Sequence, residues 1–246
     1  MTAITAIIGG TGLTQLEHLV IEERECLTTP YGDPSSDLLF GRLHGQEIVF
    51  LSRHGDPHIL PPHRVNYRAN LWALKHAGAT CILAIAAVGG ITPRMVPGKL
   101  AVPDQLIDYT YGRAHTFYED DLRRVTHVDF SQPYTPWLRE KLLVAAKLAG
   151  VDMIDGGTYG CTQGPRLETA AEILRMERDG CDLVGMTGMP EAALAREQEI
   201  DYASCAVIAN WAAGKQAAEI TMAEIEANLN VGMADLGRLL QHWIQS

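Results

Sequence analysis

Small and hydrogen-bonding residues follow two short apolar runs of the sequence, and their types suit the binding of an anion. The first run ends in Gly9-Gly10-Thr11-Gly12, where glycines allow close approach of the backbone and the Thr11 hydroxyl can join backbone N–H groups around an anion. The second ends in Ser52-Arg53-His54-Gly55, which places a guanidinium and an imidazole at the end of a buried strand. Because open α/β sheets bind ligands at the carboxyl ends of their strands, both segments predict an oxyanion site.

Two further strand ends repeat this pattern. A third apolar run leaves through Ala86-Ala87-Val88-Gly89-Gly90, and another ends in Gly185-Met186-Thr187 just ahead of a helix expected at Pro190. An arginine, a histidine and two threonines beside glycine-rich exits favour an oxyanion such as phosphate. Two alternatives stay open at this point: a plain turn at Gly9–Gly12, and a structural ion pair between Arg53 and one of the thirty acidic residues.

Other readings of the same residues are weaker. His54, His58 and His63 lie in a proline-rich segment, but their spacing matches no usual zinc pattern, so no metal is expected. The turn at Gly9–Gly12 lacks the third glycine of a dinucleotide-binding fingerprint. A dinucleotide oxidoreductase is therefore disfavoured.

Strands and helices alternate among the elements that must position these residues. Apolar, β-branched runs predict buried strands, and apolar residues at three- and four-residue intervals predict helices. The predicted strands are Ala3–Ile8, Ile48–Leu51, Cys81–Ala87, Leu100–Val102, Cys181–Val184 and Tyr202–Ala209. The predicted helices are Val65–His76, Pro136–Ala149, Thr169–Arg178 and Glu191–Glu199, with one or two closing helices after a capping box at Thr221 and Glu224. Residues 1–246 show no repeat or linker and are expected to form a single α/β domain.

Composition and charge limit the classes of function that this chain can have. The chain has 246 residues, 47% hydrophobic and 20% charged, which is typical of a globular protein. Its net charge of −10 opposes non-specific binding to nucleic acid and to anionic membranes, so neither partner is expected. The five cysteines form no C-x-x-C pair and are typical of reduced thiols. Because no signal peptide or membrane-spanning run is evident, a soluble cytoplasmic protein is expected.

Five motifs in register carry a family resemblance. They are Gly9-Gly10-Thr11-Gly12-Leu13, Arg53-His54-Gly55, Val65-Asn66-Tyr67-Arg68-Ala69-Asn70, Gly164-Pro165-Arg166, and Met186-Thr187 through Pro190-Glu191. In this order, over nearly the whole chain, they resemble the trimeric purine nucleoside phosphorylase and methylthioadenosine phosphorylase family. The resemblance implies a twisted mixed β-sheet flanked by helices, a homotrimer with sites near subunit interfaces, and phosphorolysis of a purine nucleoside. It implies no metal and no organic cofactor, with inorganic phosphate as a co-substrate.

The resemblance also implies roles for particular residues. Phosphate should meet Thr11, Arg53, His54, the backbone of Ala87 and Thr187, the ribose should lie against Met186, and His54 and Asn210 are the candidate catalytic residues. Familiar members hold Thr or Asn at the position before Ala87, whereas this chain has Ala86. That difference puts one expected contact to phosphate or ribose in question.

Two positions bear on the purine base. Members that cleave adenine nucleosides resemble one another in an aspartate after the last central strand, where this chain has Asn210. An amide can donate to N7 while meeting a 6-oxo group, and it cannot act as a proton acid. In Gly164-Pro165-Arg166-Leu167-Glu168, Leu167 is a candidate base contact and Glu168 stands where 6-oxopurine enzymes bind N1–H. Both positions favour hypoxanthine or guanine, although Glu168 could instead be a first-turn acid of a helix.

A third position bears on the 5′ end of the sugar. Inosine and guanosine phosphorylases resemble one another in using a histidine for the 5′-hydroxyl, and the corresponding position here falls at Met222. A thioether beside aliphatic neighbours suits a methylthio group and leaves a hydroxyl without a partner. The alternative is a methionine on the core face of a helix.

Taken together, these positions of the resemblance imply 5′-methylthioinosine as the expected substrate, with hypoxanthine and 5-methylthioribose 1-phosphate as the expected products. Methylthioadenosine or an ordinary 6-oxopurine nucleoside remains an alternative substrate. A non-catalytic nucleoside sensor and a hydrolytic nucleosidase are alternatives from other classes, both disfavoured by Arg53 and Thr187. His115 and residues 116–124 are candidates for the subunit contact.

Overall fold

The fold is a mixed β-sheet covered on both faces by helices. The structure is a computed structural model that describes residues 4–10, 13, 18–119, 124–217 and 219–245. The described strands are β1 (Ile4–Gly9), β2 (Leu19–Glu25), β3 (Leu38–Leu43), β4 (Gln46–Ser52), β5 (Ala79–Gly90), β6 (Leu100–Val102), β7 (Gln105–Asp108), β8 (Met153–Asp155), β9 (Thr158–Cys161), β10 (Leu183–Gly185) and β11 (Asp201–Trp211). The described helices are α1 (Tyr67–His76), α2 (Pro136–Ala149), α3 (Ala170–Arg178), α4 (Gly188–Glu197) and α5 (Met222–Gln245). The predicted α/β fold class is confirmed.

Strand β5 is the hub of the sheet. On one edge it pairs in parallel with β11 along most of its length, from Cys81 to Gly90. On the other edge it pairs in parallel with β1 as far as Ala84, and then antiparallel with β10 at Gly89 and Gly90. The path β2-β3-β4-β1-β5-β10-β9-β7 runs across the sheet, with β6 and β8 attached through β11. The second edge of β5 therefore changes partner between Ala84 and Gly89.

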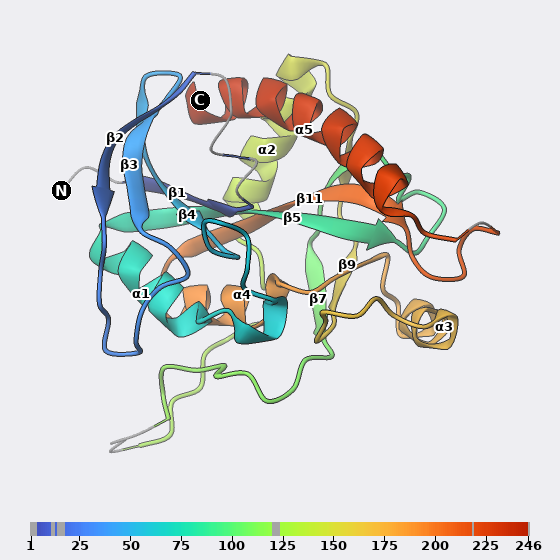
Figure 1. Ribbon diagram of the computed structural model, residues 1–246, viewed down its shortest axis with the longest axis horizontal. Helices are drawn as coiled ribbons and strands as arrows, with labels where there is room; N and C mark the ends of the chain where they lie inside the picture. The colour runs from blue at the N-terminus through green and yellow to red at the C-terminus, as the bar shows by residue number, and fades with distance from the viewer. Residues whose placement is uncertain (1–3, 11–12, 14–17, 120–123, 218, 246) are drawn as a thin grey trace.

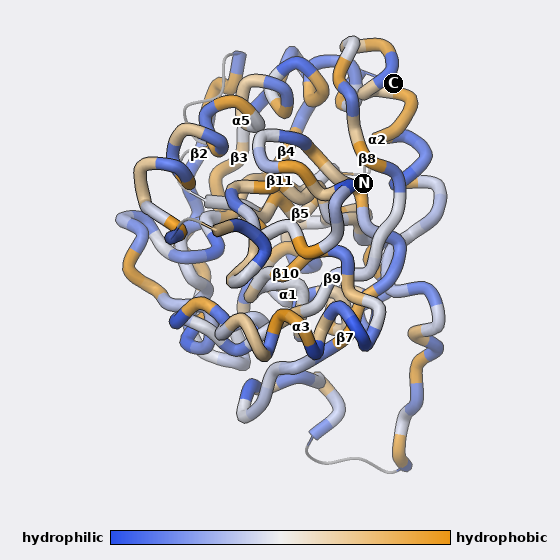
Figure 2. The backbone as a smooth tube through the Cα atoms, turned by 90° about the vertical axis from the view of Figure 1, so that its right-hand side faces the viewer, coloured by the Kyte–Doolittle hydropathy of each residue, from blue (hydrophilic) through white to orange (hydrophobic). Residues whose placement is uncertain are grey.

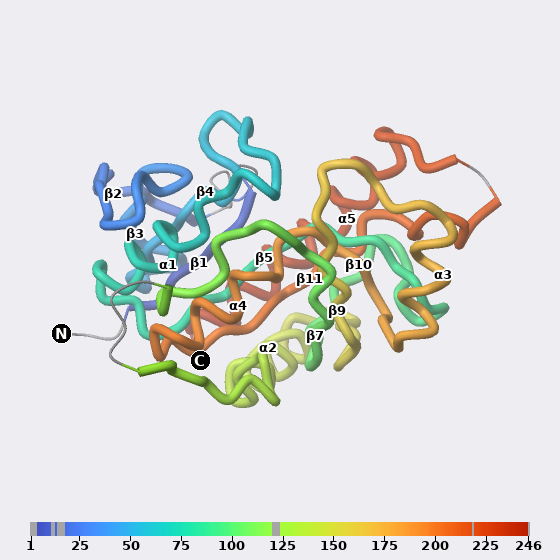
Figure 3. Tube along the Cα trace, turned by 90° about the horizontal axis from the view of Figure 1, so that it is seen from below, coloured from blue at the N-terminus to red at the C-terminus, as the bar shows by residue number. Residues whose placement is uncertain are grey.

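Alternation along the strands explains why helices cover both faces. Ile7 and Leu83 join the core beneath α2 and α5, whereas Ile8 and Ile82 join the core beneath α1 and α4. Successive side chains of a strand point to opposite faces, so apolar neighbours need a helical layer on each side. Figure 1 shows α5 and α2 above the sheet with α1 and α4 below it, and Figure 3 shows the same lower layer from beneath.

Local signals set the ends of the helices. The Asn66 side chain accepts the Ala69 N–H at the start of α1, and Thr169 forms a capping box with Glu172 at the start of α3. Gly150 ends α2 with a φ of 66°, a left-handed conformation that glycine adopts without strain. The Glu224 N–H bonds to the Thr221 hydroxyl at 3.2 Å, and the chain then closes on one helix of 24 residues rather than two.

Hydrophobic residues predominate in the central strands, and the outer segments of the chain mix hydrophilic and hydrophobic residues (Figure 2). Between β7 and α2, the described residues 109–119 and 124–135 form no helix or strand, and part of them extends away from the body of the molecule (Figure 1). Among the described residues, no helix has the length and apolarity needed to cross a bilayer.

Candidate active site

A gap in the sheet creates the site. Between the end of the β1 ladder at Ala84 and the β10 ladder at Gly89, no strand among the described residues pairs with that edge of β5. The Ile85 carbonyl in this gap instead accepts the Nη1 of Arg53 at 2.8 Å. Because the backbone groups of alternate residues point to the same edge, Ala87 directs its N–H into the same gap. Ala87 is exposed although it lies in the middle of the central strand.

A cavity of about 900 Å³ opens over this gap. Its walls come from the ends of β1, β4 and β10, from the middle of β5, from β11, and from the first half of α5. The predicted site residues that line it are Arg53, His54, Ala87, Leu167, Glu168, Met186, Thr187 and Asn210. The volume lies within the usual range of small-molecule sites. Side chains from motifs that lie far apart in the sequence thus meet in one cavity.

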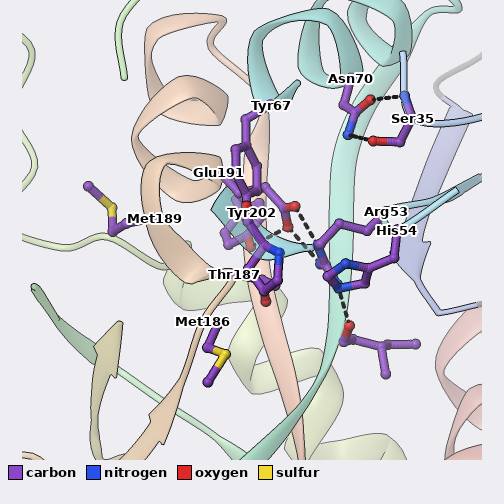
Figure 4. Close-up of polar contacts among 12 residues, drawn as sticks. Ser35, Arg53, His54, Tyr67, Asn70, Met186, Thr187, Met189, Glu191 and Tyr202 are labelled. Atoms are coloured by element: carbon purple, nitrogen blue, oxygen red, sulfur yellow. Dashed lines mark hydrogen bonds and ion pairs between the residues drawn. The ribbon is translucent and has the colours of Figure 1, made fainter. Parts of the chain in front are cut away.

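Arg53 is both an ion-pair partner and a wall of the cavity. Its guanidinium is 2% exposed and donates from Nε and Nη2 to the Glu191 carboxylate at 2.6 and 2.8 Å (Figure 4). Glu191 is fully buried and also accepts the Tyr202 hydroxyl at 2.8 Å. Burial opposes the charged guanidinium, but the Glu191 carboxylate outweighs burial and holds the pKa of Arg53 above its ordinary value. The pair fixes the fork in one orientation and leaves one N–H on each terminal nitrogen for a ligand.

His54 is held as a neutral imidazole. Its Nδ1 lies 2.8 Å from the Leu60 carbonyl, and its ring stacks on His58 with centroids 4.6 Å apart. Burial, followed by the neighbouring Arg53 cation, lowers the pKa of His54 to about 4. Since a carbonyl only accepts, Nδ1 carries the proton and Nε2 presents a lone pair. His54 can therefore accept a hydrogen bond from a protonated phosphate oxygen or a sugar hydroxyl.

Met186 and Thr187 leave β10 at the cavity wall. Thr187 is 7% exposed and directly precedes α4, which contains a kink at Met189, where φ is −122° and ψ is 140°. Its N–H donates to the Tyr159 hydroxyl at 3.4 Å. Figure 4 shows Thr187 between Met186 and the side chains of Arg53 and His54, and all four residues line the cavity.

Asn210 and Glu168 also line the cavity. Asn210 is 8% exposed and follows a β-bulge in β11, and its amide nitrogen donates to the Trp211 carbonyl at 2.7 Å. One amide N–H and the amide oxygen remain for a ligand. Glu168 accepts the Thr162 hydroxyl at 2.6 Å. Glu168 precedes Thr169, the N-cap residue of α3, so it is not the first-turn acid of that helix.

Two residues singled out from the sequence, Met222 and His115, do not line the cavity. As the first residue of α5, Met222 is 76% exposed, and nearby Ile220 and Ile225 form the apolar wall in its place. His115 is exposed, and its Nδ1 lies 3.2 Å from the Arg113 carbonyl. Thr11 lies outside the described residues.

Comparison with known proteins identifies the family of this chain. A model described as "Phosphorylase superfamily" matches residues 4–245. The chain belongs to the phosphorylase superfamily. Within it, a protein of Pseudomonas syringae named probable S-methyl-5′-thioinosine phosphorylase is 60% identical over 241 residues, covering 96% of this chain and 98% of that protein. A 6-oxopurine nucleoside phosphorylase of Pyrococcus furiosus is 42% identical over 240 residues, covering 96% of this chain and 89% of that protein.

A solved structure shares the same superfamily fold. Methylthioadenosine phosphorylase from Schistosoma mansoni in complex with adenine is 31% identical, with a TM-score of 0.93, and the match covers 99% of this chain and 91% of that one. Since the sheet and its flanking layers are shared over almost the whole length, the resemblance stated from the motifs is confirmed.

Sequence reasoning missed some of the polar groups that organise this superfamily site. Glu191 was noted only as part of a motif, yet its carboxylate orients Arg53 from 138 positions away. A buried guanidinium requires a partner of this kind, but thirty acids were available and none could be selected from the sequence. Among the described residues, no group of three or more His, Cys, Asp or Glu is placed to hold a metal ion.

Proposed function

We propose that this protein catalyses the phosphorolysis of S-methyl-5′-thioinosine to hypoxanthine and 5-methylthioribose 1-phosphate. The observation that carries the proposal is that Asn210 and Glu168 line the same cavity as the apolar side chains of Ile220 and Ile225. The two polar residues suit a 6-oxopurine, and the two isoleucines suit a methylthio group better than a hydroxyl. The relatives named for methylthioinosine and for 6-oxopurine nucleosides support this choice.

At the base, Asn210 and Glu168 would distinguish hypoxanthine from adenine. Asn210 would donate its remaining N–H toward N7 and O6, where negative charge grows as the base leaves. The Glu168 carboxylate would accept N1–H, a donor that adenine lacks. Facing an adenine N1 lone pair, the carboxylate would lose that partner, which costs about 1–3 kcal/mol.

At the sugar, phosphate would lie in the gap of the sheet. Arg53, the Ala87 N–H and Thr187 would donate to its oxygens, and neutral His54 would accept from a protonated oxygen. A phosphate oxygen then bonds to C1′ as the C1′–N9 bond breaks, and N9 keeps the bonding pair. The transition state has oxocarbenium character, and fixed groups on both sides stabilise the separated charges. The hypoxanthine anion then takes up a proton to complete the reaction.

Ala86 stands where familiar members of the family have Thr or Asn, so one polar contact to phosphate or ribose would be missing. It lines the cavity beside Ala87 and offers only a methyl group. Binding of phosphate and ribose near Ala86 would therefore depend on backbone N–H groups and on the residues opposite.

The decisive test is product formation from methylthioinosine, methylthioadenosine, inosine and adenosine, each with and without phosphate, compared as kcat/KM. A phosphate-dependent preference for methylthioinosine is expected. A preference for methylthioadenosine would contradict the roles of Asn210 and Glu168, and a preference for inosine would contradict the apolar 5′ wall. Turnover without phosphate would identify a nucleosidase, and no turnover with any nucleoside would favour a sensor.

We also propose that the protein is a cytoplasmic homotrimer that needs no metal or organic cofactor. The family resemblance supports the trimer, and five free cysteines, of which only Cys26 is exposed, fit a reducing compartment. Light scattering on a sizing column should give three times the 26.9 kDa chain mass. Activity should also survive dialysis against a chelator.

A further inference from the structure

Arg113 is a buried arginine behind the cavity wall. Its side chain is 8% exposed, and it lies in the long segment between β7 and α2. Within the part of the chain that the structure describes, no Asp or Glu forms an ion pair with it. A buried guanidinium without a carboxylate is costly, so its hydrogen bonds must come from elsewhere.

Those hydrogen bonds connect Arg113 to two walls of the site. Nη1 donates to the Met186 carbonyl at 3.0 Å and also to the Met189 carbonyl, which brace the turn that holds Thr187. Nη2 donates to the carbonyls of Thr162 and Gln163 at 3.2 and 2.9 Å. Thr162 and Gln163 directly precede the segment that carries Glu168.

A third wall is reached through Tyr67. Arg113 Nη1 lies 3.3 Å from the Tyr67 hydroxyl, and its guanidinium carbon lies 5.5 Å from the centre of that ring. The Tyr67 hydroxyl donates to the Pro62 carbonyl at 3.1 Å, and Pro62 lines the cavity. One guanidinium thus connects three parts of the lining.

The charge of Arg113 matters because the other charged groups of the cavity are neutralised or negative. The Arg53 cation is matched by Glu191, so that pair is formally neutral. His54 is neutral at pH 7, because burial and Arg53 hold its pKa near 4. Glu168 and Glu226 add negative charge to the lining. Arg113 is thus a buried positive charge behind the wall that no described carboxylate balances at contact distance.

We propose that Arg113 is a positioning residue that braces the Met186–Met189 turn and also contributes a positive charge that favours binding of the phosphate anion. This inference rests on the proposed function, which assigns the phosphate to Arg53, His54 and Thr187. The two arginines would then have different roles in phosphate binding. The Arg53–Glu191 pair fixes the direction of the hydrogen bonds to phosphate, and Arg113 provides positive charge that Glu191 does not cancel.

The sharpest test is Gln163→Glu. The Gln163 side-chain oxygen accepts Arg113 Nε at 3.1 Å and the Tyr111 N–H at 3.2 Å, and Gln163 does not line the cavity. A glutamate keeps both hydrogen bonds and the size of the side chain but cancels the charge of Arg113. The KM for phosphate and the calorimetric dissociation constant of inorganic phosphate should rise about 5- to 20-fold, while the nucleoside KM stays within about twofold. A purely structural role predicts no change in phosphate binding and an equal or higher Tm.

Two substitutions of Arg113 complete the series. Arg113→Gln should weaken phosphate binding more than Gln163→Glu, because both charge and carbonyl contacts are lost. Arg113→Lys should recover much of the phosphate affinity while remaining less stable than wild type. Arg139→Gln is the matched control: Arg139 donates to the Pro103 carbonyl at 2.9 Å and to Asp155 at 2.6 Å away from this cavity. It should lower Tm without changing the KM for phosphate.

The outcomes distinguish this inference from the proposed function. If the wild type binds phosphate but cleaves no nucleoside, the proposed function fails and calorimetry still tests Arg113. Unchanged phosphate affinity in a folded Gln163→Glu protein would overturn the inference while leaving the proposed function intact. Because Gln163→Glu leaves Arg113 in place, it tests the inference even if Arg113→Gln does not fold.

Discussion

The two ends of the cavity are built in different ways. At the Arg53 end, Arg53, Glu191 and Tyr202 are buried and joined by hydrogen bonds of 2.6 to 2.8 Å. At the α5 end, most of the lining side chains are apolar, among them Ile220 and Ile225, although Glu226 and Asn230 also line the cavity. Neighbouring Met222 is 76% exposed. A directional polar network tolerates little change, because every removed partner leaves another group buried and unpaired. An apolar wall loses only contact area, so its substitutions should have smaller, graded effects.

The largest effect is expected from Glu191→Gln. The amide cannot balance the buried Arg53 cation, and removing one member of a buried ion pair costs about 3–5 kcal/mol. We expect kcat/KM to fall at least about 100-fold and Tm to drop. Tyr202→Phe, which removes one hydrogen bond and leaves both charges, is the control and should lose about tenfold or less. A Glu191→Gln enzyme within tenfold of wild type would break the comparison between the two ends.

Asn210→Asp tests the wall that faces the base. The carboxylate removes an N–H donor, so kcat/KM for methylthioinosine should fall about 30- to 100-fold, the size of losing a catalytic hydrogen bond. Activity on methylthioadenosine should rise, because a carboxyl group can serve N7 and the 6-amino group. Competition between the two nucleosides in one reaction measures both changes. The proposed role of Asn210 would be refuted by equal losses on both nucleosides.

Ile225→Ala and Met222→Ala sharpen the comparison at the α5 end. Ile225 lines the cavity, so truncation should lower kcat/KM for methylthioinosine about 5- to 20-fold, with less effect on inosine. Met222 is exposed in this chain, so its truncation should change activity less than about threefold. A larger effect of Met222→Ala than of Ile225→Ala would show that the methionine, as first predicted, carries the 5′ selectivity.

The smallest effect concerns pH and His54. Its pKa is lowered from 6.5 to about 4 in the folded protein, so below pH 6.5 the unfolded chain binds the extra proton first. The contribution of His54 to stability is complete above pH 6.5 and is lost as pH falls toward 4. His54→Gln should therefore flatten the dependence of Tm on pH between 6.5 and 4. His63→Gln, in the same loop, is the control, and an unchanged slope in His54→Gln would contradict the prediction.

Much of the scaffold could be predicted from local patterns. Predicted helix Pro136–Ala149 matches α2 at both ends, because a proline opens it and Gly150 closes it. The buried strands β1, β4, β5, β6 and β11 coincide with apolar runs, although β5 extends to Gly90 beyond the predicted Ala87. Strands β2, β3, β7, β8 and β9 were missed. Most residues of β2, β7 and β8 are exposed or only partly buried, so no apolar run marks them. Strands β3 and β9 are mostly buried, but each is short and contains a glycine that interrupts the apolar run.

The sequence by itself determined which residue types stand at the strand ends, because glycines, Arg53, His54 and Thr187 follow apolar runs that must be buried. Only the tertiary structure decided that Glu191 orients Arg53, that the ladders of β1 and β10 stop short of Ala87, and that Ile225 faces the cavity while Met222 does not. The reason is physical. Local propensity and hydrophobic pattern act over a few residues, whereas the partner of a buried charge and the edge of a sheet depend on segments far apart in the chain.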